Sequence, residues 1–166
     1  MRKLIYLFLA LIIVACSGED GGNDGDNNGD NNNETQEEWL LVHTADNAQV
    51  TNTTIVMPMT NDIFAFTNRP YRKHFYMNGE QFTSLWDDNE EIDNFYTDPP
   101  NAVLTWVDGG EVKEVEVVIT DAIFDGNTIS YTIINNTGII TGDIVYVSLF
   151  IDDPGAGSLS AGNQWG

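Results

Sequence analysis

The sequence predicts an all-β fold, namely an antiparallel β-sandwich of about seven to nine strands with one short helix. From residue 39 onward, short runs rich in Val, Ile, Thr and aromatic residues alternate with polar residues at the period of two that strands require. Turns containing Asp, Asn and Gly separate these runs at close spacing. Only residues 78–86 carry the apolar spacing of a helix. Together these observations indicate a meandering β-domain.

The first three strands are expected at residues 39–43, 50–59 and 62–68. Pro58 has no amide hydrogen to donate to a strand ladder, so it indicates that the second strand ends at a sheet edge. Strand periodicity assigns the third strand two faces, with Ile63, Ala65 and Thr67 on one and Phe64 and Phe66 on the other.

The predicted helix follows Asn78, which is a favoured residue at a helix N-terminus. Gln81 stands three positions later, where its side chain can complete a capping box. Phe82, Leu85 and Trp86 recur at i, i+3 and i+4 and would form the buried stripe.

The second half of the domain consists of further strands joined by tight turns. Residues 102–107 and 111–120 are expected to form a hairpin around Asp108-Gly109-Gly110. In its second strand, Val115, Val117 and Ile119 would face one way and Glu114, Glu116 and Val118 the other. A turn at Asp125-Gly126-Asn127 joins residues 122–124 to a strand at 128–134, in which Ile129, Tyr131 and Ile133 share a face. Residues 144–151 are apolar enough to be a central strand.

The N-terminus has the features of a secretion signal. Residues 1–3 include two basic side chains, and residues 4–15 form an apolar run that is too short for a bilayer, which takes roughly 20 residues. The run ends Ile13-Val14-Ala15-Cys16, which resembles a bacterial lipobox. This resemblance implies cleavage before Cys16 and attachment of diacylglycerol, with fatty acids such as palmitate, to its sulfur. An uncleaved anchor or an ordinary signal peptide is the alternative.

The sequence divides into four segments. They are a signal peptide (1–15), a lipidated acidic tether (16–38), a β-sandwich domain (39–153) and a Gly/Ser-rich tail (154–166). Residues 17–38 have no apolar side chain to bury, so we expect this tether to be disordered. Glu19-Asp20 resembles the acidic signal that directs some lipoproteins to the outer face of the outer membrane. We therefore expect a monomeric outer-membrane lipoprotein that is exposed at the cell surface and attached to the membrane by its N-terminal lipid.

Charge limits the partners. The chain has a net charge of −20, and loss of Arg2 and Lys3 with the signal peptide makes it −22. Nucleic acids and anionic lipids are polyanions, so this charge argues against both as partners. Divalent cations or cationic surfaces suit it better, and solubility alone is the alternative explanation. Cys16 is the only cysteine, so no intrachain disulfide can form.

Basic residues gather in one place. Apart from Lys113, the basic residues beyond the signal peptide are Arg69, Arg72 and Lys73, which lie within five positions. With His74 they could bind an anion, because guanidinium groups match carboxylate, sulfate or phosphate. Alternatively, Arg69 pairs with Asp98, whose backbone is held by the following Pro-Pro pair. Both interpretations remain open from the sequence.

An acidic loop follows the helix. Oxygen-bearing side chains alternate at Asp87, Asn89, Glu91 and Asp93, a spacing that calcium loops use, and Asp98 falls at the twelfth position. Ile92 occupies the place where such a loop needs glycine. The alternatives are a solvated acidic loop and a calcium site. No other cofactor is expected.

Four segments resemble a family of small, secreted, functionally uncharacterised bacterial β-domain proteins. They are residues 66–72 (Phe-Thr-Asn-Arg-Pro-Tyr-Arg), Phe82 with Trp86, residues 98–102 (Asp-Pro-Pro-Asn-Ala) and residues 149–152 (Leu-Phe-Ile-Asp). The likeness covers nearly all of residues 39–153 and implies the β-domain fold without an activity. Asn68 stands where the family pattern usually has Asp.

Enzyme signatures are lacking in the sequence. His43 and His74 are accompanied by no Gly-x-Ser-x-Gly motif, zinc-binding His pair or phosphate-binding glycine motif. Trp86, Trp106 and Tyr96 could belong to the core or stack on sugar rings. The sequence therefore favours a lipid-anchored binding or structural module with an unidentified extracellular ligand and no catalysis. The alternative is an extracellular glycan hydrolase that uses paired carboxylates.

Overall fold

The structure is a computed structural model that describes residues 37–87, 94–134 and 141–153. All of these residues belong to one unit, Glu34–Gly166. Among them no helix is both long and apolar enough to cross a membrane.

The described residues are mostly strand, and the all-β prediction with one short helix is confirmed. The helix α1 (Gly79–Thr83) continues into the 3-10 turn η1 (Ser84–Trp86). The eight strands are β1 (Trp39–Val50), β2 (Thr54–Pro58), β3 (Ile63–Thr67), β4 (His74–Met77), β5 (Asn101–Asp108), β6 (Glu111–Phe124), β7 (Thr128–Ile134) and β8 (Gly142–Asp152).

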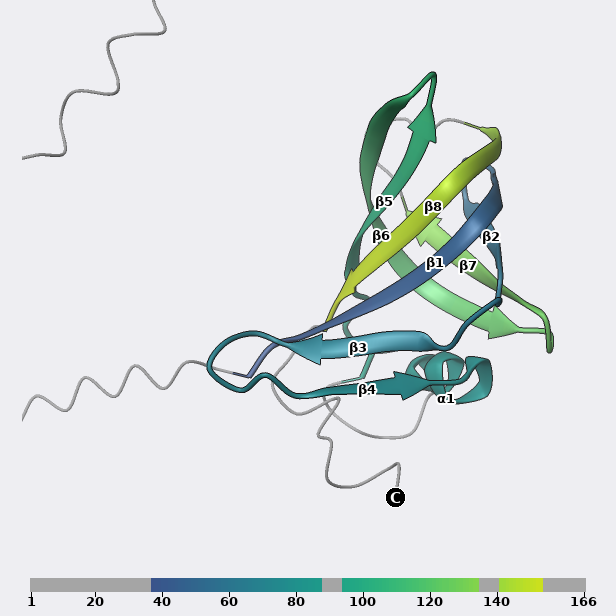
Figure 1. Ribbon diagram of the computed structural model, residues 1–166. Helices are drawn as coiled ribbons and strands as arrows, with labels where there is room; N and C mark the ends of the chain where they lie inside the picture. Colours follow the sequence, from purple (N-terminus) through teal and green to yellow (C-terminus); the bar gives the residue numbers. More distant parts are fainter. Residues whose placement is uncertain (1–36, 88–93, 135–140, 154–166) are drawn as a thin grey trace, which may run out of the picture. The chain divides into compact units, whose positions relative to one another are not determined.

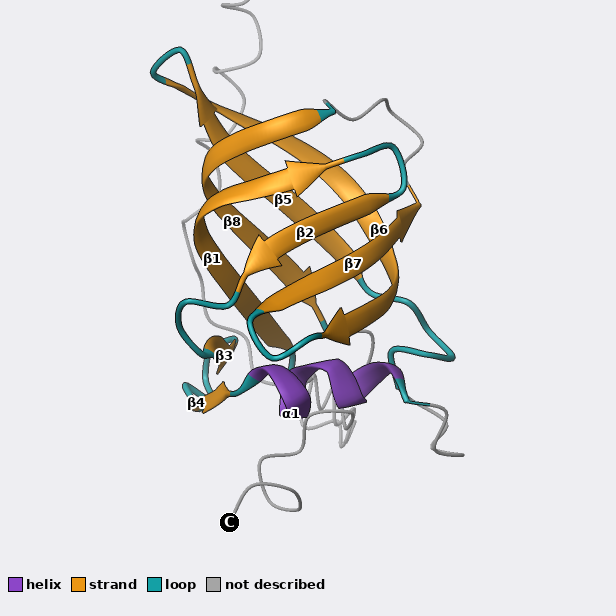
Figure 2. Cartoon of the chain, turned by 90° about the vertical axis from the view of Figure 1, so that its right-hand side faces the viewer, coloured by secondary structure: helices purple, strands orange, loops and turns teal. Residues whose placement is uncertain are grey.

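All eight strands belong to one antiparallel sheet in the order β2-β7-β6-β5-β8-β1-β3-β4. Strand β2 also pairs with β1, so six strands close into a ring from which β3 and β4 extend (Figure 1). Opposite sides of this continuous sheet pack against each other as the layers of a sandwich do (Figure 2).

Strand β1 makes this arrangement possible because it has two partners on one side. Residues 39–42 pair with β3, whereas Gln49 and Val50 pair with β2. Its other side pairs with β8 over almost its whole length. Strand β1 therefore belongs both to the ring and to the β3–β4 extension.

Two irregularities bend the sheet. The register of β5 on β8 shifts between Thr105 and Val107, close to Tyr146, whose φ of 53° is in the left-handed region. The register of β6 on β7 shifts between Ile119 and Asp121. Such bulges increase strand twist and bending, which a closing sheet requires.

The inward faces of the strands form the core, and α1 with η1 covers one end of the closed sheet (Figure 2). The rings of Phe82 and Phe95 contact Trp86 edge to face, with centroids 5.3 and 4.7 Å away. The Trp86 indole N–H donates to the carbonyl oxygen of Ile119 over 3.3 Å. The helix therefore seals the interior with aromatic side chains.

Local features were predicted more successfully than element ends. The capping box is present, since the Asn78 side chain accepts from the Gln81 amide and the Gln81 side chain accepts from the Asn78 amide. The faces predicted for residues 63–67 and 114–119 are also confirmed.

Three predicted strand boundaries are wrong. The first strand runs to Val50 rather than ending at residue 43, and the second begins at Thr54 after a turn. Strand β6 is continuous through Asp121 because a bulge carries it. Strand β4 had not been predicted.

Candidate functional site

The basic residues lie in the loop that joins β3 to β4 and projects to the left in Figure 1. Lys73 forms an ion pair with Glu37 over 2.7 Å. Its backbone amide donates to the Thr67 hydroxyl over 2.8 Å, and the Thr67 amide donates to the Lys73 carbonyl over 3.0 Å. Lys73 therefore has a structural role at the base of the loop.

Asn68 joins this loop to the chain that precedes β1. Its amide donates to the backbone oxygen of Glu38 over 3.1 Å, and its side-chain amide donates to the Glu38 carboxylate over 3.3 Å. Glu37 and Glu38, which the sequence assigned to the tether, thus contact the β-domain.

Arg69 and Arg72 are both exposed at the tip of the loop. The peptide bond between Arg69 and Pro70 is cis, and Arg72 has a φ of 54°. In residues 37–87, 94–134 and 141–153 the ion pairs are Lys73–Glu37 and Lys113–Glu111 only. Within that part of the chain, neither arginine has a carboxylate partner.

The predicted ion pair between Arg69 and Asp98 is absent. Arg69 follows β3 and Asp98 precedes β5, and strands β8 and β1 lie between those two strands. Three strand spacings of about 4.8 Å put the two strands roughly 14 Å apart at this end of the sheet. Both side chains are exposed instead.

The outer face of β3 and β4 carries an aromatic cluster, which we call the outer aromatic cluster and define as Phe64, Phe66, His74 and Tyr76. The Phe64 ring lies at its centre, with centroid distances of 5.5 Å to Phe66, 6.1 Å to His74 and 5.1 Å to Tyr76. Tyr76 is 63% exposed. The cluster is therefore a set of mutually packed rings at the protein surface.

The cluster continues across the sheet as a row of directly paired residues, which we call the outer row. Each member pairs with the next on the neighbouring strand, and directly paired residues share a face. Its members are Tyr76, Phe64, Val42, Phe150, Val103 and Glu116. Five strand spacings of about 4.8 Å give a length of roughly 24 Å along the curved surface.

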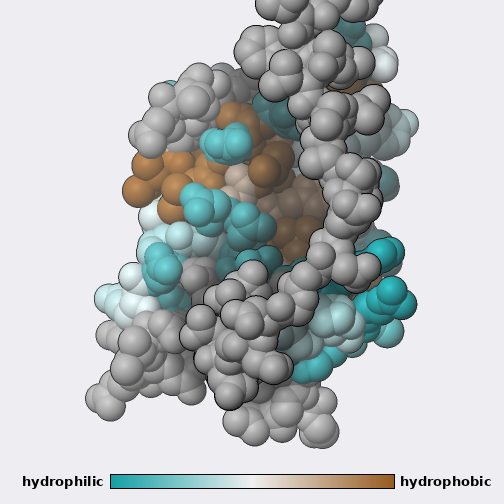
Figure 3. Space-filling model, turned by 90° about the vertical axis from the view of Figure 1, so that its left-hand side faces the viewer, coloured by the Kyte–Doolittle hydropathy of each residue, from teal (hydrophilic) through white to brown (hydrophobic). Residues whose placement is uncertain are grey.

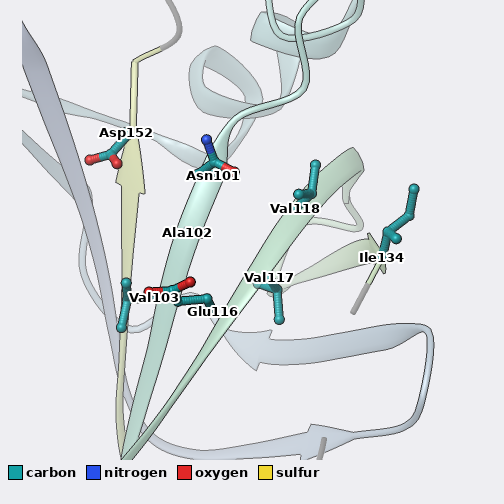
Figure 4. A pocket seen from close by; sticks show the side chains of 8 residues that line it. All are labelled: Asn101, Ala102, Val103, Glu116, Val117, Val118, Ile134 and Asp152. Carbon is teal, nitrogen blue, oxygen red and sulfur yellow. The ribbon is translucent and has the colours of Figure 1, made fainter. Parts of the chain in front are cut away.

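A cavity of about 490 Å³ lies at the end of the outer row that is remote from the aromatic cluster. It is lined by Asn101, Ala102, Val103, Glu116, Val117, Val118, Ile134 and Asp152 (Figure 4). Asp152, Asn101 and Glu116 supply polar groups from three adjacent strands, β8, β5 and β6. Viewed from the left of Figure 1, hydrophobic residues gather on an outer face bordered by hydrophilic ones (Figure 3).

Two carboxylates line this cavity from different strands. Glu116 is in the outer row, whereas Asp152 is two residues beyond Phe150 on a strand two places away. This register separates their Cα atoms by about 12 Å, and both side chains point outward. In Figure 4 the two carboxylates lie at different levels along the strands.

A buried polar pair in the core escaped the sequence analysis. His43 is 1% exposed, and its Nδ1 lies 2.7 Å from the Tyr131 hydroxyl while its Nε2 lies 3.2 Å from the Pro58 carbonyl oxygen. Because the carbonyl can only accept, Nε2 carries the proton and the Tyr131 hydroxyl donates to Nδ1. The alternation of Trp39, Leu41 and His43 was the signal that His43 points inward.

Burial keeps both members of this pair neutral. Desolvation lowers the pKa of His43 to about 4, although its hydrogen bond to the Pro58 carbonyl opposes the shift. Burial likewise raises the pKa of Tyr131 well above its ordinary value. The pair is a structural part of the core rather than an accessible acid or base.

Most of the predicted calcium ligands lie outside the part of the chain that the structure describes. Asp87 is exposed, whereas Asn89, Glu91 and Asp93 lie outside the described residues, as does Cys16. Among the residues that are described, no three His, Cys, Asp or Glu side chains come together as a metal site would require. Trp86 and Trp106 are buried core residues, and Tyr96 is 55% exposed.

Comparisons of the chain with protein-family models, with curated proteins and with solved structures give no match.

Proposed function

We propose that this protein is a lipid-anchored, surface-displayed binding module whose extracellular ligand lies along the outer row. The observation that carries the proposal is the continuous run of outward side chains from Tyr76 through Phe64 and Val42 toward Glu116. A run of outward side chains of this length, exposed at Tyr76 and Glu116 and half-buried between them, has no role in the core, which the inward residues already fill. Binding of an extended ligand gives these side chains a function.

The form of the molecule supports binding more than catalysis. Apolar side chains with a few polar groups at one end are typical of binding sites. The lipobox ending at Cys16 and the acidic segment after it support display of this surface away from a membrane.

A binding screen tests the proposal. The probe is a panel of neutral and acidic polysaccharides, and the protein is residues 16–166 with Cys16→Ser, so that no lipid is attached. We expect at least one polysaccharide to bind and Tyr76→Ser to weaken that binding about fivefold or more, because an exposed aromatic contact contributes on the order of 1 kcal/mol or more.

Tyr96→Ser is the matched control, since Tyr96 is similarly exposed but lies outside the outer row. It should bind as the parent protein does. The proposal is overturned if no polysaccharide binds, or if Tyr76→Ser and Tyr96→Ser have the same effect.

A further inference from the structure

The cations with no carboxylate partner lie beside the outer aromatic cluster. Of the basic side chains in the described ranges, Lys73 and Lys113 are paired with Glu37 and Glu111, whereas Arg69 and Arg72 form no ion pair there. Arg69 is three residues beyond Phe66 and Arg72 is two residues before His74. Each arginine backbone is thus within about 10 Å of a cluster residue along the chain.

The neighbouring carboxylates cancel only part of this positive charge. Glu37 is bound to Lys73, whereas Glu38 keeps its charge because the Asn68 side-chain amide that donates to it is neutral. With Arg69 and Arg72 included, these five side chains still have a net charge of +1. In a chain with a net charge of −20, two exposed guanidinium groups at one loop tip form a local cationic site. Guanidinium groups bind carboxylate and other oxyanions through paired N–H donors.

The character and the size of the cluster point to the rest of the ligand. Its members combine apolar ring faces with polar atoms at exposed Tyr76 and His74, a combination that complements a sugar ring with its apolar face and hydroxyl rim. The outer row that continues from the cluster is one residue wide on each strand and roughly 24 Å long. A surface this narrow suits a slender chain better than a folded protein.

We infer that the ligand of the outer row is an anionic polysaccharide, with its carboxylate or sulfate groups on Arg69 and Arg72 and its sugar rings on the outer aromatic cluster. The inference rests on the proposed function and specifies its ligand class. The arginines would select for charge, and the rings would supply contact with each sugar unit. The anionic groups would stay at the loop tip and the cluster, because the far end of the outer row carries Glu116 beside Asp152 and the chain as a whole repels polyanions.

Matched pairs of polymers test this inference. The probes are polygalacturonate with its neutral methyl ester, dextran sulfate with dextran, and polyglutamate as a polyanion without sugar rings. The protein is again residues 16–166 with Cys16→Ser. We expect at least one of the two anionic polysaccharides to bind more than tenfold more tightly than its neutral counterpart and than polyglutamate, and this binding to weaken with added salt. The preferred pair identifies carboxylate or sulfate as the bound group.

Variants locate the charge recognition. Arg69→Gln with Arg72→Gln should lower affinity for the preferred anionic polysaccharide at least tenfold, because two charge-assisted contacts are lost. Lys113→Gln, which removes a paired cation elsewhere, should change affinity less than twofold. Both arginines are exposed, so the melting temperature should stay unchanged and report intact folding.

Each other result overturns the inference. Equal binding of neutral and anionic polysaccharides would show that the arginines do not select for charge. If Tyr76→Ser still weakened that binding, the proposed function would stand although the inference fails. Equally tight binding of polyglutamate would mean that charge alone is recognised. Absence of binding to all five polymers would overturn the inference, and the wider polysaccharide panel would then decide separately whether the proposed function falls as well.

Discussion

His43 and Tyr131 are polar residues buried in the core. Unlike an apolar pair, they need hydrogen-bond partners there. They come from β1 and β7, the two strands that flank β2, and the Pro58 carbonyl of β2 completes the set. Each buried polar atom has a partner, which keeps the cost of burial low as long as the imidazole stays neutral. Protonation would place an uncompensated charge in the hydrophobic core.

The stability of the fold should therefore decrease in mild acid. His43 has a pKa of about 4 in the folded state and 6.5 as a free side chain, so the unfolded chain takes up a proton first as the pH falls. Its contribution is complete above pH 6.5 and is lost between pH 6.5 and 4, amounting to about 3 kcal/mol. Denaturant titrations over this pH range measure it.

Carboxylates also titrate in this range, so the comparison needs matched variants. His43→Gln should lack this part of the pH dependence, because glutamine has no proton to gain. His74→Gln, which changes the exposed histidine, should retain it. Parallel pH profiles for the parent and His43→Gln would contradict the prediction.

At single residues, the sequence predicted burial better than pairing. The alternation of Ile129, Tyr131 and Ile133 placed these side chains inward correctly, since strand periodicity is a local property. The proposed partner of Arg69 was wrong because pairing depends on strand order, and Asp98 is separated from β3 by two strands. The outer row could not be predicted from the sequence either, since its six members come from six different strands.

Individual elements were predictable where a local signal decides them. The capping box at Asn78 and the turn at Asp125 each depend on a few adjacent residues. In the turn, the Asp125 carboxylate accepts from the backbone amides of Asn127 and Thr128 over 3.0 and 2.8 Å. The second half of β1 was not predictable, because Asp46, Asn47 and the nearby alanines have low strand propensity. Pairing with β8 overrides that propensity.

The contact between α1 and β6 predicts the effect of adding one methyl group, the alanine side chain, at Gly79. A Cβ atom at Gly79 would lie 2.6 Å from ring carbons of Phe124, so any other residue at this position requires the Phe124 ring to move. Gly79→Ala should lower the free energy of unfolding by about 1–3 kcal/mol through overpacking, despite the higher helix propensity of alanine. Thermal or denaturant unfolding measures the loss.

Glu80→Ala is the control in the same turn, and because Glu80 is exposed its effect should stay within about 0.5 kcal/mol. Adding Phe124→Leu to Gly79→Ala should restore part of the loss, since the smaller side chain vacates the space. A stabilised Gly79→Ala protein would show that the helix moves away at no cost.

For the whole molecule, charge and anchoring belong together. Nearly all of the basic residues outside the signal peptide lie in one loop, whereas the 26 acidic residues are spread along the chain. An anionic membrane would repel such a chain, so the lipoprotein interpretation requires the covalent lipid at Cys16 to hold it there. The acidic composition then favours a domain held away from the bilayer surface.

The anchoring prediction concerns Cys16. Cys16→Ser should release the protein into the soluble fraction, because serine cannot form the thioether to diacylglycerol. Asn27→Ser, a change in the segment after the lipobox, should leave the protein in the membrane fraction. Fractionation of cells followed by immunoblotting measures both. Undiminished membrane association of Cys16→Ser would contradict the lipoprotein interpretation.

The pairing of β1 with β8 delays closure of the domain until the whole chain is available. β1 is the first strand in the sequence and β8 is the last, and β8 fills the place between β1 and β5. Until β8 is in place, both neighbours have open edges that can pair with other chains. Pairings this distant in sequence also form slowly. A chain that is still emerging, at the ribosome or during export, is therefore vulnerable to aggregation until its final strand arrives.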